Sequence, residues 1–320
     1  MDKEIRIANT DLSLCPIGLG TVGAGIHWDG ADADRLIDTY LDLGGNLIDS
    51  ARIYSDWIPP EIGRSERVIG DWLQRSGKRN RVTLITKGGH PVFRSLTDDL
   101  HISRMTRADM QHDIELSLKA LRVDTIDIYF YHRDNRAQSI EEEIETMEQF
   151  RQAGKIRYYG CSNWEADRIS DADAYCKAKG YRGFIADQAL LNLGTKYMKC
   201  LPDDTLVWIK NDLFAYHEQN LANLAMPYMG VASGFFHIYA AKGEEGVKNN
   251  PYYTPQNINV AKRCAELMKK YNASISQVVL GFFFQLPFPA VPLYGPENVE
   301  QLKDAMGTLN IKFEKTDFDI

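Results

Sequence analysis

The residues with the clearest potential for chemistry are Asp49, Tyr54, Lys87 and His132, each just after an apolar run typical of a β-strand. Tyr54 follows Asp49 at the spacing of a short loop. A lysine oriented by an aspartate places a cation beside the tyrosine, so we expect the pKa of Tyr54 to lie below its usual value of about 10. A histidine there can donate a hydrogen bond to a carbonyl oxygen that gains negative charge. This group suits proton transfer to a carbonyl that accepts hydride, which needs no metal.

Each of these residues has a plainer interpretation when taken singly. An aspartate or lysine at a strand end is often half of an ion pair, and a lone tyrosine or histidine more often belongs to the core or the surface. Their joint position after three successive predicted strands favours a shared site, because catalytic residues gather at the carboxyl ends of barrel strands.

The elements that must position these residues alternate along the whole chain. Apolar runs predict eight strands, and stretches of helical period follow seven of them, with one intervening segment enlarged. Strict alternation implies parallel strands with right-handed crossovers, and eight repeats favour a closed (β/α)8 TIM barrel of the α/β class over an open sheet. We expect one domain over residues 1–320, with a hairpin over 4–14 closing the barrel bottom. The predicted strands are 14–20, 47–51, 82–86, 126–131, 156–160, 184–188, 226–231 and 290–293, and the predicted helices are 31–44, 65–76, 106–121, 140–153, 165–179, 212–221, 259–271, 276–285 and 299–309.

Composition and charge exclude several classes of protein. The chain has 320 residues, 44% of them hydrophobic and 25% charged, with a net charge of −7, so no basic field suits nucleic acid or anionic lipid. The start lacks the apolar core of a signal peptide, and no apolar run approaches the roughly 20 residues of a membrane helix. Five scattered cysteines indicate reduced thiols, and the histidines show no metal-binding spacing. We expect a cytoplasmic protein without metal, membrane or nucleic-acid partner.

Several segments together resemble the aldo-keto reductases, nearly from end to end. Residues 18–21 read Gly-Leu-Gly-Thr, like the family's opening motif, and residues 46–51 with Tyr54 and 63–66 resemble the block around its catalytic tyrosine. Segments 116–122, 155–157 and 160–164 resemble the approach to the active-site histidine and the later Gly-Lys-Ile-Arg and Gly-x-Ser-Asn signatures. The chain is similar to a bacterial-type member of unassigned substrate.

The resemblance implies roles for these residues. Tyr54 would be the proton donor, tuned by Lys87 and Asp49, and His132 would orient the carbonyl. Ser162, Asn163 and Gln188 would hold the nicotinamide carboxamide, with Tyr228 stacked on the ring. The full set of nucleotide contacts implied is Gly20, Thr21, Asp49, Ser162, Asn163, Gln188, Tyr228, Met229, Gly295, Glu297 and Gln301.

Two departures from the family pattern bear on the cofactor. The usual Tyr-Ser-Pro-Leu is Tyr-Met-Gly-Val at 228–231, which removes the hydroxyl and proline of the pyrophosphate loop. Many members carry an arginine for the adenosine 2′-phosphate where this chain has Glu297, Glu300 and Gln301, and carboxylates repel a phosphate. This pattern favours NADH as the cofactor. A contact from Lys262 or Arg263 to the 2′-phosphate would favour NADPH instead, so both cofactors stay open. Ala305 replaces the usual adenine-contacting asparagine.

The predicted function is NAD(P)H-dependent reduction of an aldehyde or ketone, sugar-derived carbonyls included. Aromatic residues Trp28, Trp57, Trp164 and Phe236 are predicted to line the mouth of the substrate pocket. Arg52 and Arg133 either bind a substrate carboxylate or hydroxyl or are solvated rim charges, and His90 is expected to be an ordinary loop residue. The substrate, the reaction direction and the oligomeric state stay open.

Two other functions are compatible with the fold. One is a nicotinamide-binding regulatory or sensor protein on the same barrel, because fold alone does not determine function. The complete tetrad of Asp49, Tyr54, Lys87 and His132 argues against this alternative. The second alternative is a metal-dependent sugar isomerase. Activity that is unchanged by a metal chelator would exclude it.

Overall fold

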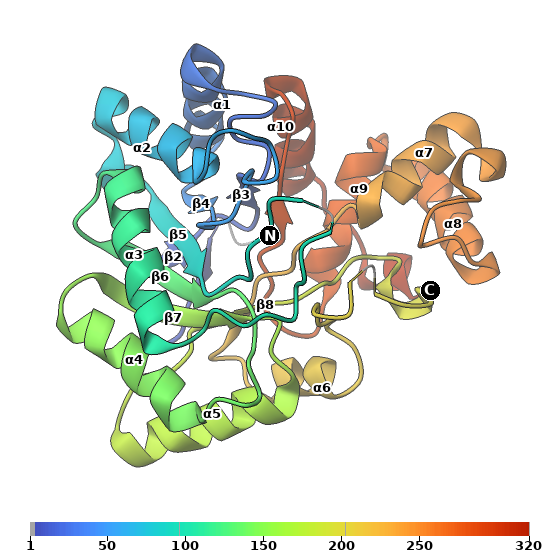
Figure 1. Cartoon of the computed structure of the whole chain (residues 1–320). Helices are drawn as coiled ribbons and strands as arrows, with labels where there is room; N and C mark the ends of the chain where they lie inside the picture. Colours follow the sequence, from blue (N-terminus) through green and yellow to red (C-terminus); the bar gives the residue numbers. More distant parts are fainter. Residues whose placement is uncertain (1–3, 96, 202, 320) are drawn as a thin grey trace.

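Eight parallel strands form a closed barrel in the computed structural model, which describes residues 4–95, 97–201 and 203–319 (Figure 1). Their order is β10-β3-β4-β5-β6-β7-β8-β9. The ring closes where Val291 N donates to Ala225 O over 2.9 Å. The strands are β3 (Gly18–Gly20), β4 (Leu47–Asp49), β5 (Thr83–Gly88), β6 (Ile126–Tyr131), β7 (Ile156–Ser162), β8 (Ala186–Gln188), β9 (Leu224–Ala225) and β10 (Leu293–Tyr294). The predicted (β/α)8 barrel is confirmed.

Helices surround this barrel, and α7 and α8 project to one side of it (Figure 1). Local sequence sets the start of a helix: the Thr106 side chain accepts from Asp109 N at the start of α3. The helices are α1 (Gly30–Asp42), α2 (Arg64–Ser76), α3 (Arg107–Leu121), α4 (Ile140–Gln152), α5 (Ala166–Lys179), α6 (Asp212–Gln219), α7 (Phe235–Lys242), α8 (Pro255–Tyr271), α9 (Ile275–Gly281) and α10 (Val299–Met306). None of those within the described ranges is long and apolar enough to cross a membrane.

The predicted hairpin is present as β1 (Ile5–Arg6) and β2 (Ser13–Leu14), which pair antiparallel. Its residues Ile7, Leu12 and Leu14 are buried against the inward side chains of the barrel strands. The hairpin therefore closes the end of the barrel opposite the predicted site.

The structure differs from the predicted elements at three places. The strand predicted over 226–231 is β9, which ends at Ala225, because Pro227 has no N–H for a sheet and Met229 takes a φ of +55°. Helix α7 was not predicted; it belongs to the enlarged segment before α8. The helix predicted over 276–285 ends as α9 at Gly281 and continues as a 3-10 turn over Phe282–Gln285.

The alternation of side chains along the strands positions the site. Inward-facing residues form one apolar cluster: Ile7, Leu12, Leu14, Leu47, Ile85, Ile128, Phe130, Ile185, Ala186, Leu224, Met226, Val291 and Leu293. Residues two positions apart share a face of a strand. For β4, β5 and β6, the residue two positions after the last inward apolar residue is Asp49, Lys87 and His132, respectively. All three therefore point inward at the carboxyl end of the barrel.

Candidate active site

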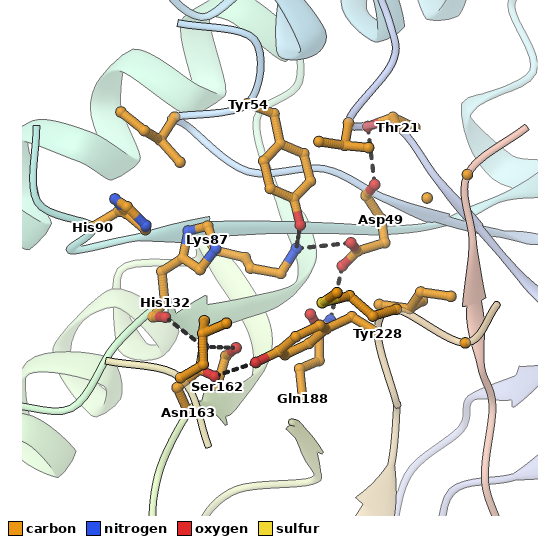
Figure 2. Close-up of a pocket in the computed structure, with 18 of the residues that line it drawn as sticks. Thr21, Asp49, Tyr54, Lys87, His90, His132, Ser162, Asn163, Gln188 and Tyr228 are labelled. Atoms are coloured by element: carbon orange, nitrogen blue, oxygen red, sulfur yellow. Dashed lines mark hydrogen bonds and ion pairs between the residues drawn. The ribbon is translucent and has the colours of Figure 1, made fainter. Parts of the chain in front are cut away.

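The ammonium of Lys87 organises the centre of the site (Figure 2). Its Nζ donates to Asp49 Oδ2 over 2.7 Å, to the backbone oxygen of Ser50 over 2.8 Å and to the Tyr54 hydroxyl over 2.9 Å. An ammonium has three N–H donors, so all are used. Lys87 is 1% exposed and Asp49 is also buried, so the two form a buried ion pair. The phenol of Tyr54 accepts the third hydrogen bond of the ammonium.

Burial keeps the phenol of Tyr54 protonated. Burial raises the pKa of Tyr54 above its ordinary value, the positive charge of Lys87 lowers it, and the negative charge of Asp49 raises it again, with a net upward shift. The prediction that its pKa is lowered was therefore wrong for this structure, because the sequence shows the neighbours of a residue but not its depth. Burial lowers the pKa of Lys87, but the attraction of Asp49 and Tyr54 outweighs it and raises the pKa overall. The site holds a neutral phenol beside a cation.

Two neutral histidines form one wall of the site. The His132 ring lies edge-on to Tyr54 with centroids 5.8 Å apart, and His90 packs against His132 at 4.6 Å. Burial, with the positive charges nearby, holds the pKa of His132 well below its usual range, and burial lowers the pKa of His90 to about 3. The buried Nδ1 of His132 has no hydrogen-bond partner among the described residues. A neutral ring with an unpartnered nitrogen can serve a ligand.

A cavity of about 380 Å³ opens above these residues. All four members of the tetrad line it, together with most of the predicted nucleotide contacts: Gly20, Thr21, Ser162, Asn163, Gln188, Tyr228, Met229 and Gly295. Glu297 and Gln301 do not line it; they lie at the start of α10, where Glu297 N donates to Gln301 Oε1 over 2.9 Å. The cavity thus joins the tetrad to the predicted nicotinamide residues, while the two α10 residues stand apart.

Asn163 fixes the shape of the cavity wall. Its φ is +64°, a left-handed conformation that asparagine tolerates. Its Nδ2 donates to His132 O over 3.2 Å and to Ser162 Oγ over 3.0 Å, and its Oδ1 accepts from Tyr228 OH over 2.5 Å. Both ends of the Asn163 amide are thus engaged within the protein, and they fix the ring of Tyr228.

Ser162 and Gln188 keep groups available to a ligand. Gln188 Nε2 donates to Asp49 Oδ1 over 2.8 Å, and no donor among the described residues reaches its Oε1. Ser162 Oγ accepts from Asn163 and retains its own O–H as a donor. One acceptor and one donor beside the aromatic ring of Tyr228 match the amide N–H and oxygen of a primary carboxamide, so these residues fit a nicotinamide.

Three of the four aromatic residues predicted to line the pocket do not line it. Trp57 does. Trp28 is buried and donates through Nε1 to Pro296 O over 3.0 Å, and Phe236 is buried in the first turn of α7, where it packs against Phe235. Trp164 is buried in the core, with its Nε1 bonded to Arg133 O over 3.0 Å. Their side chains serve packing, which the position of a residue along the chain does not reveal.

The two arginines beside the tetrad have different surroundings. Arg52 Nη1 lies 3.2 Å from the buried carboxylate of Glu66, so it compensates a buried charge. Arg133 lines the cavity and is not a solvated rim charge, since its side chain is 11% exposed.

Arg263, which the sequence offered as a partner for a 2′-phosphate, forms an ion pair with Glu266 over 2.9 Å.

The most informative residue that the sequence analysis missed is His90. It was expected to be an ordinary loop residue, but it is buried, lines the cavity and contacts His132. Its place three residues after Lys87, just beyond β5, was the available signal. Ile53, Leu206 and Val231 add apolar lining from loops whose shape the sequence did not reveal.

Comparison with known proteins agrees with this geometry. Residues 16–320 match the Aldo/keto reductase family. The chain is 26% identical to "Uncharacterized oxidoreductase YrpG" of Bacillus subtilis (strain 168), over 97% of this chain and 91% of that protein. It is 25% identical to "Aryl-alcohol dehydrogenase GME11368" of Pestalotiopsis microspora, over 97% of this chain and 78% of that protein. It is 24% identical to "Protein tas" of Escherichia coli (strain K12), over 97% of this chain and 94% of that protein.

Proposed function

The chain belongs to the aldo/keto reductase family and is an NAD(P)H-dependent oxidoreductase, and on that premise we propose that it reduces an aldehyde or ketone to an alcohol with Tyr54 as proton donor. The observation that carries the proposal is the 2.9 Å hydrogen bond from Lys87 to Tyr54, made by an ammonium that Asp49 also holds. A sugar-derived carbonyl falls within this class of substrate.

In this proposal Ser162 and Gln188 hold the carboxamide of the nicotinamide, and the ring of Tyr228 packs on its face. The bound dihydronicotinamide supplies the hydride. The Ser162 O–H donates to the carboxamide oxygen, and Gln188 Oε1 accepts from the carboxamide nitrogen. Because Asn163 fixes the Tyr228 hydroxyl and Asp49 fixes the Gln188 amide, both contacts are oriented before a ligand arrives.

The chain's own residues complete the reduction by moving one proton. The Tyr54 O–H donates its proton to the carbonyl oxygen as negative charge develops there. The phenolate that remains is stabilised by Lys87, which stays charged and already contacts the oxygen. Neutral His132 donates a second hydrogen bond to the same carbonyl oxygen and fixes its position. The buried surroundings strengthen both interactions.

The adenosine end of the cofactor is assigned to the start of α10. Glu297 and Glu300 stand there beside Gln301, and their carboxylates oppose a 2′-phosphate. The proposal is therefore that NADH is accepted and that these carboxylates disfavour the 2′-phosphate of NADPH.

The test follows oxidation of NADH and of NADPH by purified protein with a panel of aldehydes, ketones and reducing sugars. Turnover that requires the Tyr54 hydroxyl would support the proposal. Tight nucleotide binding without turnover of any carbonyl would favour a nucleotide sensor instead, and failure to bind either nucleotide would contradict the assignment of the cavity.

A further inference from the structure

Arg133 is a buried cation that faces the cavity without a close anionic partner. Its Nη1 donates to His132 O over 2.9 Å and its Nε to Thr205 Oγ1 over 3.1 Å. Both acceptors are neutral. The remaining guanidinium N–H groups, including those of Nη2, have no acceptor within hydrogen-bond distance among the described residues; the nearest carboxylate, Asp203, is 3.9 Å from Nη2.

The acidic residues around Arg133 compensate its charge only weakly, because the nearest carboxylate oxygen, Asp203 Oδ2, is 3.9 Å from Nη2 and the others contact other side chains. Asp203 Oδ1 accepts from both the backbone and the hydroxyl of Thr205, over 2.7 and 2.8 Å. Asp134 pairs with Arg168 over 3.1 Å. Asp204 lies 3.1 Å from His101. The guanidinium charge is therefore weakly compensated, although burying a charge is unfavourable unless it is paired.

The cavity as a whole carries one excess positive charge. Among the residues that line it, Asp49 and Lys87 cancel each other, and the two histidines and three tyrosines are neutral. Arg133 is the charge that remains, and a guanidinium keeps its proton under all ordinary conditions.

We propose that Arg133 is the recognition site for a carboxylate on the substrate, so that the carbonyl compound reduced here is an aldehyde acid or oxo acid. The inference rests on the proposed function and names its substrate class. The free edge of a guanidinium matches a carboxylate in two parallel hydrogen bonds. Arg133 and His132 both line the cavity, so a carboxylate bound by Arg133 lies in the same cavity as the group that holds the carbonyl. This position favours a short substrate.

The carboxylate is unchanged by the reaction. Hydride adds to the carbonyl carbon, the Tyr54 proton adds to the carbonyl oxygen, and the products are a hydroxy acid and the oxidised nucleotide. Ile53, Trp57 and Leu206 supply the apolar lining for the carbon skeleton between the two polar groups.

The test compares each acid with its methyl ester, which keeps the carbonyl and removes the charge. The pairs are 4-formylbenzoate with methyl 4-formylbenzoate, and 4-oxobutanoate with methyl 4-oxobutanoate. We expect kcat/KM for each acid to exceed that for its ester by at least about tenfold, an effect of about 1.4 kcal/mol. In Arg133→Met this preference should fall to about one, mainly through KM, whereas Arg133→Lys should retain part of it. Arg136→Met, which removes an exposed arginine paired with Asp167, should keep the full preference.

Several outcomes would overturn the carboxylate site. One is equal use of acid and ester by the wild-type protein, and another is an unchanged preference in Arg133→Met. A tenfold or larger loss of nucleotide affinity in Arg133→Met would assign the anion to the cofactor. If the wild-type protein reduces none of the four compounds, the assignment of these carbonyls to the enzyme fails, and calorimetric titration with 4-(hydroxymethyl)benzoate decides the site separately. Binding that Arg133→Met abolishes supports the site, and absence of binding by the wild type refutes it.

Discussion

Lys87 Nζ lies 2.9 Å from the Tyr54 hydroxyl and 4.6 Å from the centre of the Tyr54 ring. The ammonium therefore contacts the phenol at its oxygen while it stays bound to Asp49. Since burial keeps the phenol neutral and Asp49 keeps the lysine charged, the pair is ready to donate a proton and then to stabilise the resulting negative charge.

Removal of the cation should destabilise the protein as well as inactivate it. Lys87→Met leaves the Asp49 carboxylate buried without its partner, and we expect a loss of about 3–5 kcal/mol in the free energy of unfolding, measured by urea titration. The double variant Lys87→Met/Asp49→Asn removes both charges and should recover a large part of that loss while staying inactive. A double variant no more stable than the single one would contradict the pairing.

The rate of carbonyl reduction should be nearly independent of pH from about 6 to about 9. The pKa of Tyr54 is raised above its ordinary value of about 10, and that of His132 is lowered well below about 6.5, so neither group titrates in this range. A profile of kcat at saturating nucleotide and substrate provides the check. A decline centred near neutral pH would show that one of the two pKa values differs from this account.

His90 should weaken the protein in acid. Its folded pKa of about 3 lies below the unfolded value of about 6.5, so the unfolded chain binds more protons between them and stability falls as pH is lowered through that window. His90→Gln removes this effect, so the variant should lose less stability than wild type between about pH 7 and pH 5. Urea titrations at both pH values measure the difference. Parallel losses in the two proteins would refute burial of a neutral His90.

The choice of nucleotide should respond to charge at the start of α10. Glu297→Arg replaces a carboxylate there with a phosphate-binding group, and we expect the ratio of kcat/KM for NADPH to that for NADH to rise at least about tenfold. The matched control is Glu141→Arg, which makes the same change in the first turn of α4. An unchanged ratio in Glu297→Arg would place the adenosine end elsewhere.

Much of the fold and the tetrad was predictable because strands have a period of two and the polar residues terminate apolar runs. Asp49, Lys87 and His132 follow inward residues by two positions, which the sequence displays directly. The direction of a loop side chain has no such period. Trp57 lines the cavity while Trp164 is buried in the core, although both come shortly after strands.

The pKa of Tyr54 and the position of His90 could not be predicted from the sequence, because both depend on the folded arrangement of loops. The pKa of Tyr54 is set by burial as well as by Lys87, and burial comes from loops that the sequence did not place. His90 joined the site through the course of the loop after β5. For β9, the apolar run at 226–231 was misleading because Pro227 and the left-handed Met229 follow the strand instead of extending it.

The most direct test of the account is the effect of Tyr54→Phe, which removes only the phenol oxygen. With a carbonyl compound that the wild type reduces, we expect kcat to fall at least about 10³-fold, near the range that a general acid contributes, while the Kd for nucleotide stays within about threefold. Tyr158→Phe, which removes an exposed hydroxyl bound to Asp11, is the control and should keep full activity. Turnover by Tyr54→Phe within tenfold of wild type would contradict the assignment of Tyr54 as proton donor.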